Sequence, residues 1–170
     1  MTAQQPDPVA ADAASLLEGN ALARTEFARA IAGLSQADRS DPWLDGWSLH
    51  EIVGHLAAWE DGFAAALELA VAGERPQVPG YDSSVDDATD RFNEDVTAAL
   101  AGVRWDGLLI RLELAAERHD AALRSVVGAL TPERFEVGRS ARRLATASNH
   151  YEEHIPQILE WRERTGRSLP

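Results

Sequence analysis

The sequence contains no cysteine, which excludes a disulfide and any thiolate ligand or nucleophile supplied by the chain itself. A chain without disulfides is typical of the cytoplasm. Residues 1–15 also lack a basic segment followed by an apolar stretch, so we expect no signal peptide. No apolar run is long enough to span a bilayer. We therefore predict a cytoplasmic protein with no membrane-spanning segment.

Basic residues are scarce beside acidic ones, with 16 Lys and Arg against 28 Asp and Glu and a formal net charge of −12. A surface of this sign repels the phosphate backbone of nucleic acids. It is repelled in the same way by anionic membrane surfaces. We therefore expect neither nucleic acids nor membranes among the partners of this protein.

Aromatic residues are few, at 6% of the chain, and β-branched residues are few beside alanine and leucine. Alanine and leucine favour helices, whereas β-branched and aromatic residues favour strands. A chain of 170 residues is long enough to bury one hydrophobic core. The composition therefore predicts an all-α protein with a single domain over residues 1–170, of which residues 1–7 are expected to be frayed.

Apolar residues recur at helical spacing in four long segments, which predicts helices at residues 8–34, 48–72, 107–130 and 141–164. A shorter helix is expected at residues 85–102, within the long connection between the second and third of these segments. No strand pattern lies between the helices. The pattern therefore indicates a four-helix bundle with a short extra helix between helices 2 and 3.

Local signals mark several helix ends. Ser48 and Glu51 form an S-x-x-E capping box, in which each residue can satisfy a free amide of the other. Asp106 is expected to cap the third long helix. Thr131 is expected to cap a short turn that begins at Pro132.

Two of the five histidines, His150 and His154, lie four residues apart in a segment predicted to be helical. The rise between them is about 6 Å, one turn, so both imidazoles can reach one ion. Apolar residues flank them on the same face, which is therefore expected to point to the core. His55 lies on a similar apolar face of the second long helix. If these helices are neighbours, three imidazoles and a water can bind Zn²⁺ or a similar divalent ion.

An alternative interpretation is that these histidines are core residues, each hydrogen-bonded to a carbonyl group and none bound to metal. The other two histidines, His50 and His119, are interpreted as surface residues, since His119 lies in the charged stretch ERHD. Glu60 and Glu152 are interpreted as solvated, although either could orient a ligand imidazole. Pro156 lies inside the last long helix and predicts a kink there.

The order of these histidines resembles the DinB superfamily of four-helix bundle proteins. The motifs are GHLAAWE, which contains His55, and SNHYEEHIPQILEW, which contains His150 and His154. The resemblance spans about residues 15–165. Within the superfamily the chain is most similar to the ClbS/DfsB branch, on the segments WSLHEIVGHLAAWE, DRFNEDV and HYEEHI.

The resemblance implies a bundle in up-down-down-up order with a tris-histidine metal site, whose ligands would be His55, His150 and His154. It implies a divalent ion, Zn²⁺ or Ni²⁺, and a homodimer. Relatives in the superfamily include transferases and isomerases that use mycothiol or bacillithiol, and a self-protection protein that opens a cyclopropane in a genotoxin. A low-molecular-weight thiol is therefore a candidate cofactor, and a small molecule is the expected partner.

Trp59, Asn93 and Tyr151 are candidate residues of a substrate pocket beside the histidines. Trp59 follows His55 by one helical turn, and Tyr151 is adjacent to His150. Asn93 lies on the short helix after the long loop and could close over the mouth of the bundle. Each has a structural alternative, since Trp59 could be core, Asn93 a cap or loop tie, and Tyr151 part of an interface.

Three hypotheses for function follow. The first is a metal-dependent enzyme, a transferase or hydrolase, that acts on a small electrophile by thiol transfer or hydrolysis. The second is a metal-free protein that binds or sequesters a small molecule in the bundle cavity, for self-protection or under stress. The third is a structural dimer without a ligand, which predicts that no pocket lies near His154. The sequence leaves open whether the protein is an enzyme.

Overall fold

The computed structural model describes residues 8–136 and 141–170, and the predicted fraying of residues 1–7 lies outside this part of the chain. Eight helices and no β-strand are present in these two segments. The four long helices are α1 (Pro8–Ile31), α3 (Leu49–Val71), α5 (Trp105–Ser125) and α8 (Ser148–Arg164). The shorter helices are α2 (Gln36–Ser40), α4 (Ala88–Leu100), α6 (Pro132–Glu136) and α7 (Ala141–Ala145).

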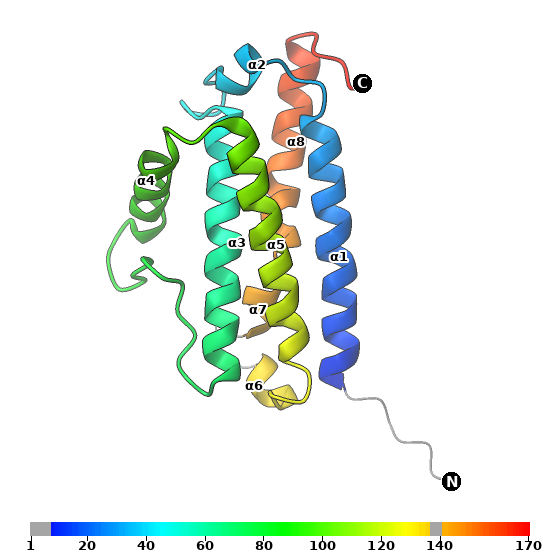
Figure 1. The fold of residues 1–170 in the computed structure, drawn as a ribbon, viewed down its shortest axis with the longest axis vertical. Helices are drawn as coiled ribbons and strands as arrows, with labels where there is room; N and C mark the ends of the chain where they lie inside the picture. The colour runs from blue at the N-terminus through cyan, green and yellow to red at the C-terminus, as the bar shows by residue number, and fades with distance from the viewer. Residues whose placement is uncertain (1–7, 137–140) are drawn as a thin grey trace.

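The four long helices form a bundle in which α1 runs upward in Figure 1, α3 and α5 run downward, and α8 returns upward. Helix α3 packs chiefly against α5, and α1 packs chiefly against α8. The predicted all-α bundle, its up-down-down-up order and its short extra helix α4 are therefore confirmed. No described helix is long and apolar enough to cross a membrane. The assignment of residues 1–170 to one domain stays a prediction.

The core of the bundle is built from the apolar stripes of all four long helices. Burying one large apolar side chain contributes about 1.5–3 kcal/mol, so this cluster is a major stabilising element. Its largest buried members are Phe27, Leu49, Ile52, Leu56, Leu108, Tyr151, Ile158 and Trp161.

Two of the three predicted caps are found at the expected positions. The Ser48 amide donates to Glu51 Oε2 at 2.7 Å, which confirms the capping box at the start of α3. The Arg134 amide lies 3.4 Å from Thr131 Oγ1 at the start of α6, as predicted. The predicted cap at Asp106 is wrong, because α5 already begins at Trp105 and Asp106 lies within its first turn. An acidic side chain there still interacts favourably with the helix dipole.

The segment predicted as one helix over residues 141–164 is divided into α7 and α8. The break falls at residues 146–147, whereas α8 continues through Pro156. Asn20 of α1 holds the two ends together: its Nδ2 donates to the Ala145 carbonyl at 2.9 Å, and its Oδ1 accepts from the Ser148 amide at 2.9 Å. One buried amide side chain thus satisfies both backbone groups that the break exposes.

Replacing Asn20 by alanine is therefore expected to lower the free energy of unfolding by about 2–4 kcal/mol, because a buried carbonyl and a buried amide lose their partners. Urea unfolding measures the change. Thr25→Ala is the matched control on the same helix, since it removes an exposed bond from Thr25 Oγ1 to the Ala21 carbonyl. That variant should stay within about 0.5 kcal/mol of the wild type. Equal free energies of unfolding for the two variants would contradict this role of Asn20 at the break between α7 and α8.

Candidate metal centre

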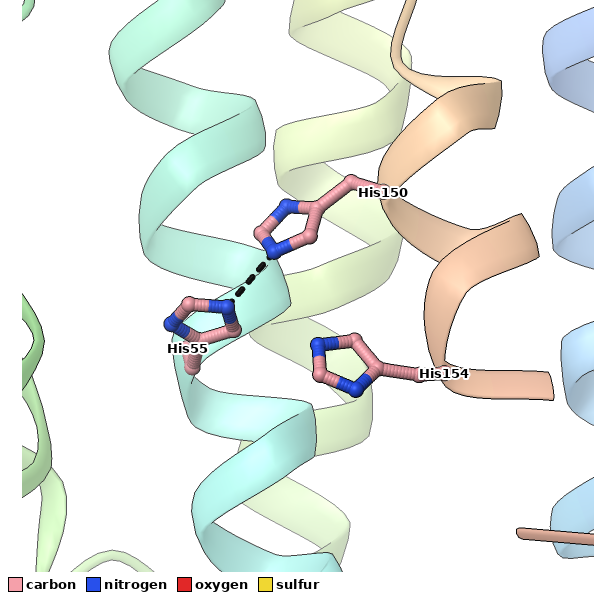
Figure 2. Close-up of side chains that lie close together, drawn as sticks. All are labelled: His55, His150 and His154. Atoms are coloured by element: carbon pink, nitrogen blue, oxygen red, sulfur yellow. Dashed lines mark hydrogen bonds between the residues drawn. The ribbon is translucent and has the colours of Figure 1, made fainter. Parts of the chain in front are cut away.

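Three imidazoles meet between α3 and α8. Figure 2 shows His55 on one helix facing His150 and His154 on the other. The ring centroids are 4.5 Å apart for His55 and His150, 5.5 Å for His55 and His154, and 5.4 Å for His150 and His154. One ring nitrogen from each residue can be chosen so that all three lie within 4.8 Å of one another. The three histidines singled out in the sequence are thus brought together.

The helices explain this convergence. His150 and His154 are one turn apart on α8, so they lie one above the other on the same face. His55 lies in the first third of α3 and reaches across from the opposite wall. His55 and His154 are buried and His150 is half-buried. The cluster therefore combines limited access to water with three nitrogen donors, which is the donor set of many open zinc sites.

A metal ion requires ring nitrogens whose lone pairs are not already used in hydrogen bonds. His154 Nδ1 lies 2.9 Å from Gln157 Oε1, an acceptor, so the proton of this imidazole resides on Nδ1. Its Nε2 is left with a lone pair that points at the other two rings in Figure 2, and this buried atom has no hydrogen-bond partner within residues 8–136 and 141–170. A metal ligand held in one tautomer by a neighbouring side chain has this arrangement.

The contact between His55 and His150 is closer than a metal would leave it. Their Nε2 atoms lie 2.6 Å apart, so one N–H donates to the lone pair of the other. Two imidazoles bound to tetrahedral Zn²⁺ would place these atoms about 3.3 Å apart. A shift of less than about 1 Å between the His55 and His150 rings would make room for an ion. The three residues therefore fit a divalent metal.

All three imidazoles are held in the neutral form. Burial lowers the pKa of His55 from 6.5 to about 3, with the charges of His150 and His154 acting in the same direction and a weaker hydrogen-bonding effect of Asn93 opposing it. Burial and His154 lower the pKa of His150 to about 4. The pKa of His154 is lowered chiefly by burial. Neutral imidazoles are the form that binds metal ions, so protons compete weakly with a metal here.

A cavity of about 840 Å³ opens beside the three histidines. This size suits a small organic molecule. Its aromatic lining includes Trp47 and Trp59, whose ring centroids lie 5.2 and 6.4 Å from that of His55. Trp59 Nε1 donates to Asn93 Oδ1 at 2.8 Å and so ties α3 to α4. Trp59 and Asn93 both line the cavity, and their role in binding a substrate stays a prediction.

Tyr151 lies in the bundle core and not at the cavity. It is not among the residues that line the cavity, and it is buried in the bundle core with its ring edge against Phe27. Its hydroxyl donates to Glu60, which is itself buried. The reason is helical geometry: adjacent residues point about 100° apart, so His150 faces the cavity and Tyr151 does not. The interpretation of Tyr151 as a pocket residue is therefore replaced by a core position.

Two surface predictions are also wrong. His119 is completely buried, and its Nε2 donates to the Leu144 carbonyl at 2.8 Å, beside the break between α7 and α8. Glu60 was predicted to be solvated but is buried, because Arg24 and Tyr151 both donate to its carboxylate. His50 is half-buried and donates to the Val103 carbonyl at 2.7 Å. Glu152 is exposed, as expected.

The sequence interpretation missed several polar residues of the cavity. Gln157 lies three residues after His154, and this i, i+3 spacing could have identified it as a partner of the imidazole. Arg143, Thr146 and Asn149 also line the cavity, at and on either side of the break between α7 and α8. No sequence signal marks that break, since the residues that hold it lie far away on α1 and α5.

The fold and the site define a helical bundle protein with a candidate tris-histidine metal centre at the edge of a cavity. Residues 21–154 match the family described as the mycothiol maleylpyruvate isomerase N-terminal domain. The match covers well over half of the chain and includes all three histidines, so the chain belongs to this family. The family is DinB-like, which confirms the superfamily but not the ClbS/DfsB branch. The searches of curated proteins and of solved structures find no match.

Proposed function

We propose that the protein is a divalent-metal-dependent enzyme that acts on a small electrophilic substrate, by thiol transfer or by hydrolysis. The observation that carries this proposal is the convergence of three neutral imidazoles at a cavity, with the lone pair of His154 Nε2 unused within the described residues. A bound Zn²⁺ or Ni²⁺ would act as a Lewis acid that makes a thiol or a water nucleophilic at neutral pH.

The residues of the chain have separate tasks in this proposal. His55, His150 and His154 hold the ion, and Gln157 fixes the tautomer of His154. The aromatic wall around Trp59 binds the apolar part of a substrate and excludes water from it. The Trp59–Asn93 hydrogen bond holds α4 against the cavity.

A thiol co-substrate is favoured by the family, whose description names mycothiol. The chain has no cysteine, so a thiol nucleophile would have to come from a small molecule. The ClbS/DfsB branch, the homodimer and the cytoplasmic location stay predictions from sequence.

The experiment uses the full chain purified without a histidine tag and loaded with Zn²⁺ or Ni²⁺. Elemental analysis measures bound metal, and product formation is measured with mycothiol, bacillithiol or water as the nucleophile and a panel of small electrophiles. We expect about one equivalent of metal and turnover that a chelator abolishes. A protein that retains no added metal and turns over no electrophile would refute the proposal.

A second candidate function is metal-free binding of a small molecule in the same cavity. The observation that favours it is the 2.6 Å contact between the Nε2 atoms of His55 and His150, a hydrogen bond that needs no ion. The aromatic lining would then bind an apolar ligand directly. Ligand-induced change in tryptophan fluorescence, undiminished by a chelator, distinguishes this function from the first.

A further inference from the structure

The helices that carry the metal ligands are not each other's main packing partners. Helix α3 packs on α5 and α8 packs on α1, and close backbone contacts between α3 and α8 are few. The distance between His55 and the pair His150 and His154 is therefore not fixed by α3–α8 packing alone. Something else must set the separation of the two helices at this level of the bundle.

A buried hydrogen bond joins α3 to α8 next to the metal centre. Tyr151 directly follows His150, and its hydroxyl donates to Glu60 Oε2 on α3. Both side chains are almost fully buried, with relative exposures of 1% for Tyr151 and 2% for Glu60. The bond thus spans the same two helices as the three imidazoles, on the core side of them.

The carboxylate of Glu60 is itself held from α1, by an arginine that also binds α5. Arg24 of α1 donates to Glu60 Oε1 through Nε at 2.9 Å, and its Nη1 donates to Asp120 Oδ1 of α5 at 2.9 Å. His119 Nδ1 of α5 lies 3.9 Å from Glu60 Oε1. Helices α1 and α8 therefore both donate to one acceptor of α3, and α5 holds the α1 donor through Asp120. An acceptor fixed in this way can define where the Tyr151 hydroxyl, and hence α8, must lie.

We propose that Glu60 and Tyr151 are positioning residues that set the separation of α3 and α8 and thereby the spacing of the three imidazoles. This inference rests on the metal centre proposed above. Neither residue is one of the three nitrogen donors or lines the cavity; both act through the helices that carry the donors. Groups that orient metal ligands typically change metal affinity by about 10- to 100-fold when they are removed.

Tyr151→Phe is the principal test, because it removes only the hydroxyl and leaves the ring in the core. Co²⁺ is the probe, since its absorption spectrum reports coordination geometry and its affinity can be measured by titration of the full chain. We expect about 10- to 100-fold weaker binding and an altered visible spectrum. Glu60→Gln can still accept from Tyr151, so it should bind Co²⁺ more tightly than Tyr151→Phe does.

Val126→Ala is the control for a loss of stability alone. Val126 is fully buried in a separate apolar cluster that includes Leu123 and Phe135 and none of the site histidines. The Val126→Ala variant should have a melting temperature several degrees lower, as Tyr151→Phe should, but an unchanged affinity for Co²⁺ and an unchanged Co²⁺ spectrum.

The outcomes separate this inference from the function on which it rests. Weaker binding and a changed spectrum in Tyr151→Phe, with Val126→Ala unchanged, support the positioning role. Wild-type affinity and spectrum in both Tyr151→Phe and Glu60→Gln overturn it while leaving the metal centre in place. A wild-type protein that binds no Co²⁺ overturns the metal centre and the positioning role together, and this result is obtained before any variant is made.

Discussion

At pH 5 the metal-free protein is expected to be about 4 kcal/mol less stable to unfolding than at pH 7, because two buried imidazoles resist protonation. The folded pKa is about 3 for His55 and about 4 for His150, against 6.5 for the unperturbed side chain. Below pH 6.5 the unfolded chain binds protons at both residues and the folded chain does not. The contribution of these two histidines to the free energy of unfolding is therefore fully present above pH 6.5. It is lost progressively as the pH falls toward their pKa values in the folded protein.

The size of this loss in stability follows from the same pKa values. Each unit of pH below 6.5 lowers stability by about 1.4 kcal/mol per histidine, or about 2 kcal/mol each at pH 5. The pKa values of His154 and His119 are also lowered by burial and act in the same direction. The carboxyl groups with lowered pKa values, such as Glu68, protonate in the unfolded chain only near or below pH 4.5, which lies outside this window.

Urea unfolding at pH 7 and pH 5, with a chelator present, measures the difference. A His150→Gln variant supplies the control, since its loss of stability between pH 7 and pH 5 should be smaller by about 2 kcal/mol, while a polar side chain stays at this position. Imidazole proton resonances followed by NMR give an independent test. Equal stability at the two pH values, or resonances of His55 and His150 that titrate near pH 6.5, would contradict the prediction.

Helical periodicity was enough to predict the long helices, because each one buries a single apolar stripe. The bounds of α3 illustrate this: the helix begins after the capping box at Ser48 and ends before Gly73, whose φ of +83° does not continue a helix. The division of the last helix was not predictable in this way. It depends on Asn20 and His119, which meet the break only after the bundle has formed.

The metal centre was predicted from spacing, whereas its surroundings were not. His150 and His154 share a face by helical geometry alone, and the apolar stripe around His55 predicted that it faces the core as well. His119 belongs to a charged stretch of sequence and Glu60 is itself ionisable, so both were assigned to the surface. The buried carboxylate of Glu60 accepts from Arg24 on a helix distant in sequence, and the buried imidazole of His119 donates to the Leu144 carbonyl. A local pattern carries no information about such a partner, so buried ionic groups are the residues that sequence reasoning misplaces.

Replacing His154 by alanine is expected to weaken Zn²⁺ binding by more than about 100-fold, since it removes one of three donors. Gln157→Ala should weaken it by a smaller factor, about 10- to 100-fold, because the imidazole stays but its tautomer is no longer fixed. His50→Gln, which alters a histidine outside the centre, should leave Zn²⁺ affinity unchanged. Competition with a chromophoric chelator measures all three dissociation constants.

The order of these three effects distinguishes a metal centre from histidines that are only part of the core. If the imidazoles serve packing alone, His154→Ala and Gln157→Ala change stability without changing the affinity for Zn²⁺. If they form a metal centre, the loss follows the distance from the ion, greatest for the donor and smaller for its hydrogen-bond partner. An equal loss in His50→Gln would place the bound zinc at surface groups, because His50 and the three clustered histidines share no contact in the described structure.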